Sequence, residues 1–569
     1  MASDKKSGDL RNLPACAVEF IRLVIKKMRY RRKVRLDVQA ELTAHFDDEL
    51  KEYTTDKERE QKARQLIAGF GDVKLLAVLL RRAKKRCRPL WRTVVARTFQ
   101  TIGVLILLFC LYTVWFLTGR PTISVDYLSV WNQMSRPQIK DEDNAWPYYE
   151  KAVALYTEPN QELNDMREFT APGRITLGSL TDDQQQKIKK WAELNESAWQ
   201  EFVKASSKSY CYREYQYDPN IKDENKWLLN VLLPHLSEIR GLARIGRWQA
   251  RIHIDANQPR QAIDDCLSIA MAGRHWKGKG TLIEQLVGLA ISNFGFEEIL
   301  NIAGTKELSS IELKHLQENL LQIYPQGYPL MNVEGERIYF LDVVQHLFTQ
   351  GGPGGGHLVP HKLTYLGDIT GSADEVRINM VRLPFYTAAA MVHAGRDKTI
   401  AKGNEIYDYQ AKRAKMTPYQ RHISDPNGVE EMISNLSKYR YFLIHLLMPA
   451  IDRVSELAYR GKVFHQATIT ILALRRWRLE KNECPANLDE LVAGGYLKEL
   501  PADPFSDKSL VYKKTGDDFT LYSVGSNFKD DGGESGKDSK GRPTKWRDNG
   551  DTVFWPVPEF RQEHSSDSE

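Results

Sequence analysis

Cysteine is scarce in this chain of 569 residues, which has six. They lie at scattered positions, 16, 87, 110, 211, 266 and 484, and no two have the CxxC spacing of a zinc or redox site. Three of them, Cys211, Cys266 and Cys484, follow the long apolar run described below. One disulfide among these three is compatible with the sequence, but reduced and packed thiols are favoured because three scattered cysteines make no disulfide framework.

The common catalytic motifs are also missing. In "HWKGKGTL", Gly280 occupies the position where a phosphate-binding loop needs Ser or Thr to hold magnesium. His357 and His361 have the spacing of two metal ligands on a helix, but Pro360 lies between them and no glutamate follows His357. The sequence contains no GxSxG elbow and no dinucleotide fingerprint after a strand. An enzyme would therefore need an unrecognised site.

Charge is unevenly distributed. Residues 1–97 contain 25 Lys and Arg against 13 Asp and Glu, a net +12, whereas the whole chain carries +6. The remaining residues therefore carry −6, which indicates that the two parts occupy different environments. Between them, residues 98–118 read "TFQTIGVLILLFCLYTVWFLT", 21 positions without an ionisable residue. That length crosses a hydrocarbon core of about 30 Å as a helix.

The flanks of this run predict its orientation. Eight Lys and Arg residues lie between positions 81 and 97, whereas only Arg120 and Arg136 follow closely. By the positive-inside rule, residues 1–97 are cytoplasmic and the rest is extracytoplasmic. Its position, about a hundred residues into the chain, predicts a permanent anchor in a bacterial inner membrane rather than a cleaved signal. The alternative is a buried core helix.

The basic part shows two helical patterns, over residues 34–53 and 58–83, with Leu36, Leu42, Phe46 and Leu50 on one face. Gly69 and Gly71 are expected to break the second helix, and Asp72 to cap the next one. The motifs "ELTAHFDDEL" and "ARQLIAGFGD" resemble the short helical domain in front of transmembrane segments in bacterial permease-like and anti-sigma-like proteins. The resemblance covers about residues 19–86 and implies an interaction or assembly module.

A dense basic run, "IKKMRYRRKVR", precedes these helices. A solvated helix face is the plain interpretation. Contact with anionic membrane lipid is the next, because an anchor lies on the same chain. No nucleic acid is expected, since no recognition motif accompanies the charge.

Helical periodicity dominates the part beyond the anchor. Its clearest unit is a helical hairpin over residues 237–273. The first helix is expected to end near Asp255, and the chain turns at "ANQP". In the second helix, Ala262, Cys266 and Ile269 recur at helical spacing. The hairpin looks like a tetratricopeptide unit, but no 34-residue period surrounds it. "GGPGGGHLVPHKL", residues 351–363, breaks the pattern and predicts a surface loop, with a lid over a cleft as the alternative.

The last part has a definite order of elements. A helix with "RRWRLEKNECPANLDELV" is followed by "YLKELPADPFSDKSLVYK" and "FTLYSVGSNFKDDGG". The alternating residues of "LVYK" and "FTLYSV" predict two strands that turn at residues 515–517. These motifs, over about residues 463–555, resemble the globular domain of the type II secretion major pseudopilin. A pseudopilin has a hydrophobic helix continuous with this domain, whereas here it lies some 350 residues upstream, so a borrowed domain is expected.

The resemblance implies calcium bound by the loop after the second strand, where several oxygen ligands suit this ion. Carried over to this chain, Val524 supplies its carbonyl, Asn527 stands where an aspartate is usual, and Asp548 and Asp551 match the later acidic pair. Asp530 or Asp531 is an alternative to Asn527. A polar turn without an ion is the competing interpretation.

The sequence thus predicts a mainly α protein with a cytoplasmic helical module over residues 1–97, a transmembrane helix over 98–118, a linker over 119–140, a helical domain over 141–460, an α+β domain over 461–558 and a disordered tail over 559–569. The predicted function is a membrane-anchored envelope scaffold for protein partners. An envelope enzyme with its site in the helical body, and a transmembrane sensor, are the alternatives.

Overall fold

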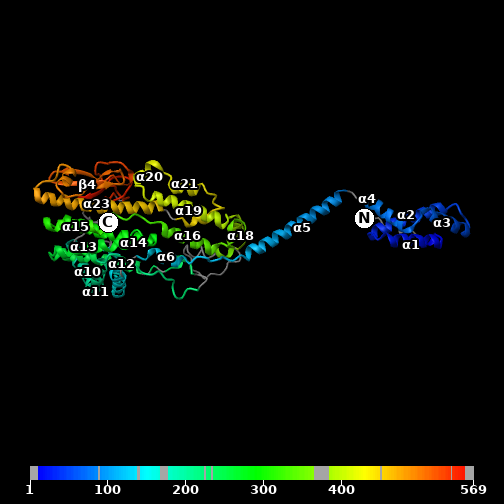
Figure 1. The fold of residues 1–569 in the computed structure, drawn as a ribbon, viewed down its shortest axis with the longest axis horizontal. Helices are drawn as coiled ribbons and strands as arrows, with labels where there is room; N and C mark the ends of the chain where they lie inside the picture. Colours follow the sequence, from blue (N-terminus) through cyan, green and yellow to red (C-terminus); the bar gives the residue numbers. More distant parts are fainter. Residues whose placement is uncertain are drawn as a thin grey trace, which may run out of the picture. The chain divides into compact units, whose positions relative to one another are not determined.

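The computed structural model describes residues 10–86, 90–137, 141–166, 169, 177–222, 226–231, 233, 235–363, 383–448, 451–539 and 541–557. The predicted tail, residues 559–569, lies outside the described residues. The chain divides after Trp115 into two compact units (Figure 1). About 65% of the residues are helical and 6% are in strands, which confirms the mainly α fold with a small C-terminal sheet.

The first unit contains α1 (Ala15–Met28), α2 (Arg32–Leu50), α3 (Asp56–Phe70), α4 (Val73–Arg86) and most of α5 (Leu90–Leu117). Leu42, Phe46 and Leu50 are buried in its core as predicted, but Leu36 is 48% exposed. Gly69 lies within α3, so the break is made by Gly71, whose φ of 72° favours glycine. Asp72 accepts the Leu75 N–H at 3.0 Å and begins α4 as predicted.

The predicted linker contains a helix. α6 (Tyr127–Ser135) begins where the Asp126 carboxylate accepts the Ser129 N–H at 3.1 Å, and it buries Trp131. This helix has nine residues, which is too short to show clear helical periodicity in the sequence. The predicted linker is therefore partly helical.

The second unit is built mainly from helix pairs. The predicted hairpin is present as α12 (Leu236–Asp255) and α13 (Pro259–Arg274). Asn257 with a φ of 57° and Pro259 at the start of α13 make its turn. Among the residues described, the further α-helices of this unit are α7 (Trp146–Leu155), α8 (Gln161–Asp165), α10 (Asp182–Leu194), α11 (Glu196–Ser206), α14 (Leu282–Thr305), α15 (Ser310–Ile323), α16 (Glu334–Leu347), α18 (Leu383–Val392), α19 (Arg396–Arg413), α20 (Pro418–Ser424), α21 (Gly428–Ser434), α22 (Phe442–Leu447), α23 (Ile451–Lys481) and α24 (Asp489–Ala493).

Two antiparallel sheets follow. β1 (Ala502–Asp503) pairs with β2 (Lys508–Ser509), and β3 (Val511–Thr515), β4 (Asp518–Ser523) and β5 (Thr552–Trp555) form a three-stranded sheet in the order β3-β4-β5. Thr515 pairs with Asp518, so the hairpin turns where the sequence predicts it, at Gly516 with a φ of 59°.

The long helix α23 joins the helical and sheet parts. It packs against α14 and α15 and also against β4 and β5 (Figure 1). One apolar core contains Phe296 of α14, Leu472 of α23 and Phe519 of β4. The boundary predicted between residues 460 and 461 falls inside this helix, so the C-terminal strands are built onto the helical body.

Two helices are long and apolar enough to cross a membrane, among the residues described. In the segment Val94–Leu117 of α5, 6% of the most apolar window is buried. In α14 the corresponding share is 67%. The burial of α14 identifies it as a core helix of the second unit.

Candidate functional site

An extended segment, Tyr210–Tyr217, crosses the helical body between α11 and α12, and two asparagine side chains hold its backbone. The Asn144 amide accepts the Tyr212 N–H at 2.9 Å and donates to the Tyr212 carbonyl at 2.8 Å. Asn132 does the same for Tyr215, at 2.7 and 3.0 Å. Each carboxamide thus stands in for the neighbouring strand that an extended backbone normally pairs with.

The same device, here called an amide clamp, recurs elsewhere in the second unit. Each clamp is one Asn or Gln side chain bonded to both the N–H and the C=O of a single distant residue. The further pairs are Asn195 with Thr157, Gln285 with Asn332, Gln345 with Val125, and Asn549 with Lys537. These clamps fix irregular segments in a body with little sheet.

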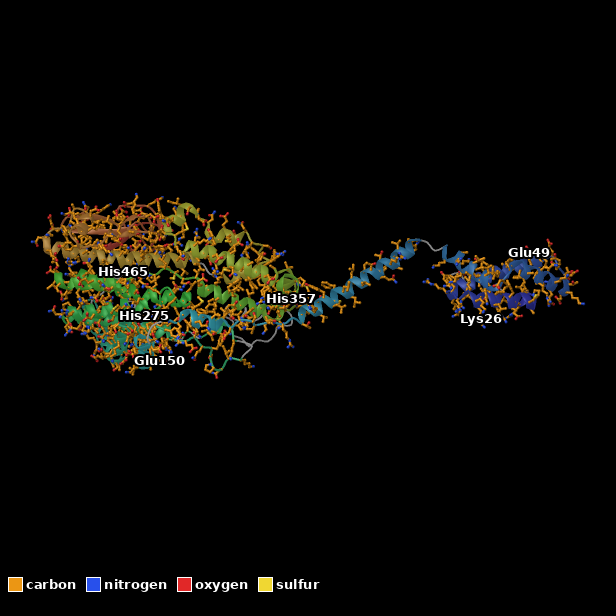
Figure 2. All side chains as sticks on the ribbon, viewed as in Figure 1. Lys26, Glu49, Glu150, His275, His357 and His465 are labelled. Carbon is orange, nitrogen blue, oxygen red and sulfur yellow. The ribbon has the colours of Figure 1, made fainter. Side chains whose placement is uncertain are left out.

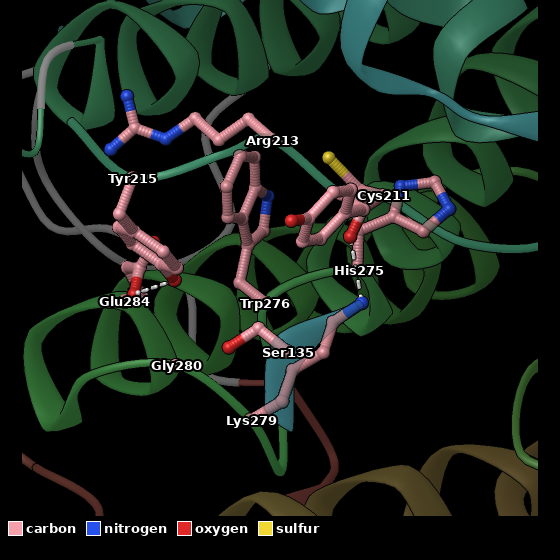
Figure 3. Close-up of a pocket in the computed structure, with 10 residues that line it drawn as sticks. Ser135, Cys211, Arg213, Tyr215, His275, Trp276, Lys279, Gly280 and Glu284 are labelled. Carbon is pink, nitrogen blue, oxygen red and sulfur yellow. Dashed lines mark hydrogen bonds between the residues drawn. The ribbon is translucent and has the colours of Figure 1, made fainter. Parts of the chain in front are cut away.

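A small cavity of about 30 Å³ lies on one side of the extended segment (Figure 3). His275 lines it, and its two ring nitrogens bond to the Tyr149 hydroxyl and to the Lys208 carbonyl, both at 2.9 Å. Burial lowers the pKa of His275 to about 3, so the ring is neutral. The neutral ring accepts a hydrogen bond from the Tyr149 hydroxyl and donates one to the Lys208 carbonyl. Both ring nitrogens are therefore occupied by hydrogen bonds within the fold.

The same cavity is closed by the start of α14. The Tyr215 hydroxyl donates to Glu284 at 2.8 Å, and Glu284 also caps α14 in a reciprocal pair with Thr281 (Figure 3). Gly280 has a φ of 72°, and a Cβ there would lie 2.4 Å from the Glu284 carboxylate. Lys279 donates to the Cys211 carbonyl at 2.7 Å, and burial lowers its pKa. The stretch "HWKGKGTL" is therefore a tight turn into α14, with room in the cavity for about one water molecule.

An open cleft of about 820 Å³ lies beside the same segment, within the size range of ligand sites. It runs between α6 and the backbone after Tyr212. Its lining is Asp126, Leu128, Ser129, Asn132, Gln133, Arg136, Tyr212, Glu214, Tyr215, Gln216, Tyr217, Asp218, Pro219, Ile221 and Lys226.

The cleft combines tyrosines, amides and charges of both signs. Two of the carboxylates that line the cleft accept hydrogen bonds from backbone N–H groups. Asp126 accepts from Ser129, and Asp218 accepts from Asn220 at 2.8 Å. Burial, followed by the charges of Asp342 and Asp126, raises the pKa of Tyr217, so this hydroxyl stays a donor. Such a surface suits recognition of polar groups.

Lys277 is a buried amine that sequence reasoning did not single out. It donates to the hydroxyls of Tyr324 at 2.7 Å and Tyr328 at 2.8 Å and lies over both rings. Burial alone lowers its pKa well below the ordinary value. Perturbed lysines occur at catalytic sites. However, Lys277 lines neither the cavity nor the cleft. Its bonds tie the turn after α13 to the turn after α15.

The predicted calcium ligands are placed in different roles. Asp551 is 1% exposed, and its two oxygens accept the backbone N–H groups of Asp531 at 3.2 Å and Gly533 at 2.7 Å. Asn527 accepts from Lys529 and donates to Asp531 at 2.6 Å. Val524 precedes a short turn, and Asp548 is exposed.

The polar atoms of Asp551 and Asn527 thus make hydrogen bonds within the loop. Among the residues described, no group of three or more His, Cys, Asp or Glu side chains is placed to hold a metal ion. The oxygens of Asp551 are used by the loop backbone, which supports the polar-turn interpretation of this arrangement. Calcium in this loop remains a prediction.

The glycine-rich loop lies at the end of α5. His357 stacks on Phe116 with ring centroids 4.3 Å apart, and its Nε2 lies 3.1 Å from the Phe116 carbonyl. A Cβ at Gly119 would lie 2.7 Å from this nitrogen. Figure 2 shows His275 and His465 inside the body and His357 near the start of the second unit. His357 of this loop thus bonds the carbonyl of Phe116, the first residue of the second unit.

Cys211, Cys266 and Cys484 are buried free thiols. Burial raises the pKa of each one, so all three favour the neutral thiol. This state agrees with the favoured interpretation of packed, reduced cysteines.

No family model, no curated protein and no solved structure matches this chain. The interpretation of function therefore depends on the chain's own geometry.

Proposed function

We propose that this chain is a single-pass protein of the bacterial inner membrane whose second unit is a scaffold for protein partners. The observation that carries the proposal is the segment Val94–Leu117, which joins two separately packed units and has 6% of its most apolar window buried. Helical residues of this length and composition span about 30 Å of hydrocarbon. An apolar helix left this exposed needs an apolar surrounding.

The charge distribution supports a cytoplasmic first unit. The dense Lys and Arg residues precede the anchor, and residues 98–569 carry a net charge of −6 by difference. The second unit is then the extracytoplasmic part.

The cleft beside α6 supports the scaffold role. It is open, it is lined by Tyr212 and Tyr217 together with amides and charges, and tyrosine is enriched where proteins bind one another. The amide clamps on Tyr212 and Tyr215 fix one wall, which lowers the entropy lost when a partner binds. A partner segment with donors and acceptors matches this lining.

Site-specific photocrosslinking in intact cells tests the scaffold. A benzoylphenylalanine in place of Glu214 or Gln216, both exposed in the cleft, should give the same protein adduct. The matched control is Lys314, which is exposed on α15 away from the cleft. An adduct from both cleft positions and none from Lys314 supports the proposal. Equal adducts at all three positions, or none at all, contradict it.

Calcium at the C-terminal loop is a separate part of the proposal and has its own test. If calcium binds the folded protein alone, millimolar calcium should raise the free energy of unfolding by about 1–3 kcal/mol over a chelator. Asn527→Ala and Asp548→Ala should each reduce this gain. An unchanged free energy leaves Asp551 as the residue that holds the loop.

A further inference from the structure

The helix α18 is ten residues long, reads "LPFYTAAAMV", and contains no charged residue. One side of it is packed, because Ala390 is 2% exposed within the same core as Phe116. The other side is bare. Phe385 is 73% exposed and Val392 is 57% exposed, and Ala388 between them is also exposed. The spacing of 385, 388 and 392 places all three on one helical face.

This face lies close to the point where the anchor ends. α18 packs against the turn Pro360–Lys362, which follows the loop whose His357 stacks on Phe116. Figure 1 shows α18 at one end of the second unit. Phe116 is the last residue but one of α5. The bare apolar face therefore lies in the same part of the second unit as Phe116, where the chain enters this unit.

The surroundings of α18 have the composition of a membrane interface. The Ala394 N–H, two residues after α18, donates to the Arg440 carbonyl at 2.8 Å. Next to Arg440, Tyr439 is 80% exposed, and Lys438 and Arg440 are exposed as well. Aromatic rings and basic side chains beside an apolar face suit the headgroup region of a bilayer that contains anionic lipid.

We propose that α18 lies in the headgroup region of the bilayer that α5 crosses, with Phe385 and Val392 inserted among the lipid chains. This inference rests on the proposed membrane anchor. It adds a second contact with the bilayer surface, which holds the second unit against the membrane. A short helix binds a surface weakly alone, but the anchor keeps it at a high effective concentration.

Photocrosslinking to lipid tests the contact in the full-length protein. The protein is reconstituted in vesicles of phosphatidylethanolamine and phosphatidylglycerol, with a benzoylphenylalanine in place of Phe385 or Val392. The matched control replaces Ile311, which is apolar and 78% exposed on α15. A second control replaces Leu108 within the anchor, which is 56% exposed. Mass spectrometry then identifies lipid adducts.

The account predicts lipid adducts at Phe385, Val392 and Leu108 and a yield at least about tenfold lower at Ile311. Adducts at Leu108 without any at Phe385 and Val392 overturn this inference and leave the anchor standing. A crosslink between two copies of the protein, formed by the benzoylphenylalanine at position 385, also overturns this inference. The apolar face of α18 would then bind a second copy and not lipid. A lack of lipid adducts at Leu108 as well contradicts the anchor itself, and the inference falls with it.

Discussion

His275 shows how a single buried residue couples this fold to pH. Its pKa is lowered by burial from 6.5 to about 3, so between these values the unfolded chain binds the proton and the folded chain does not. The free energy of unfolding therefore falls as the pH falls from 6.5 toward 3. The structure commits the neutral ring to Tyr149 and Lys208, and protonation removes its acceptor nitrogen.

Replacement of His275 with glutamine should reduce this pH dependence. Gln can accept from one partner and donate to the other, but it does not titrate. Between neutral pH and about pH 4.5, wild type should lose a few kcal/mol more stability than His275→Gln, measured by urea denaturation of the full-length protein in detergent. His393 and His465, whose pKa burial lowers to about 4, contribute equally to both proteins. Parallel curves would show that His275 is not buried as described.

Amide clamps act at the scale of the element, because each one fixes a segment that lacks a strand partner. Asn195 is fully buried, accepts the Thr157 N–H at 2.8 Å and donates to the carbonyls of Thr157 and Trp191. Asn549 makes the same two-bond contact with Lys537 at an exposed position. The two clamps share this hydrogen-bond pattern and differ in burial, so their variants measure the effect of burial.

Asn195→Asp should lower the free energy of unfolding by about 2–4 kcal/mol, because it turns two donated bonds into repulsion between oxygens in a buried site. Asn549→Asp should cost less than about 1 kcal/mol, since water replaces its lost bond. Both are measured by chemical denaturation at neutral pH. Equal costs would contradict the structural role given to burial here.

The close packing of α13 and α14 gives a second prediction at this scale. A Cβ at Gly295 would lie 2.7 Å from the Ala270 nitrogen and 2.9 Å from the Cys266 carbonyl. Gly295→Ala should therefore destabilise the protein by about 1–3 kcal/mol in spite of its gain in helix propensity. Gly304→Ala, on the same helix with its nearest neighbour at 3.7 Å, should be neutral or stabilise by up to about 1 kcal/mol. A stabilising Gly295→Ala would show that the two helices lie further apart.

Elements with local signals could be predicted from the sequence. The α12 and α13 hairpin has its turn encoded by Asn257 and Pro259, and the β3 and β4 hairpin has Gly516. The clamps could not be predicted, because they join residues from 12 to 220 positions apart and Asn and Gln have no pattern that marks such contacts. The contact of Lys277 with Tyr324 and Tyr328 could not be predicted for the same reason.

At the scale of the whole molecule, apolar length and burial must be considered together. The segment Val94–Leu117 and α14 are both long and apolar enough to cross a membrane, yet α14 is a core helix in which Gly288 and Gly295 allow close packing on α13. The sequence alone predicted one span and a separate α+β domain. In the structure, residues of α14, α23 and β4 share one apolar core. Contacts of this range depend on the whole fold.

The most direct test of the central claim is the topology of the full-length protein in cells. We expect it to stay with the membrane after an alkaline carbonate wash. We also expect external protease added to spheroplasts to digest the second unit and leave a protected fragment that contains the first unit and α5. Leu105→Arg combined with Leu108→Arg should weaken membrane retention, since charge at the centre of a span is costly. Release by carbonate, or digestion of the first unit from outside, would contradict the account.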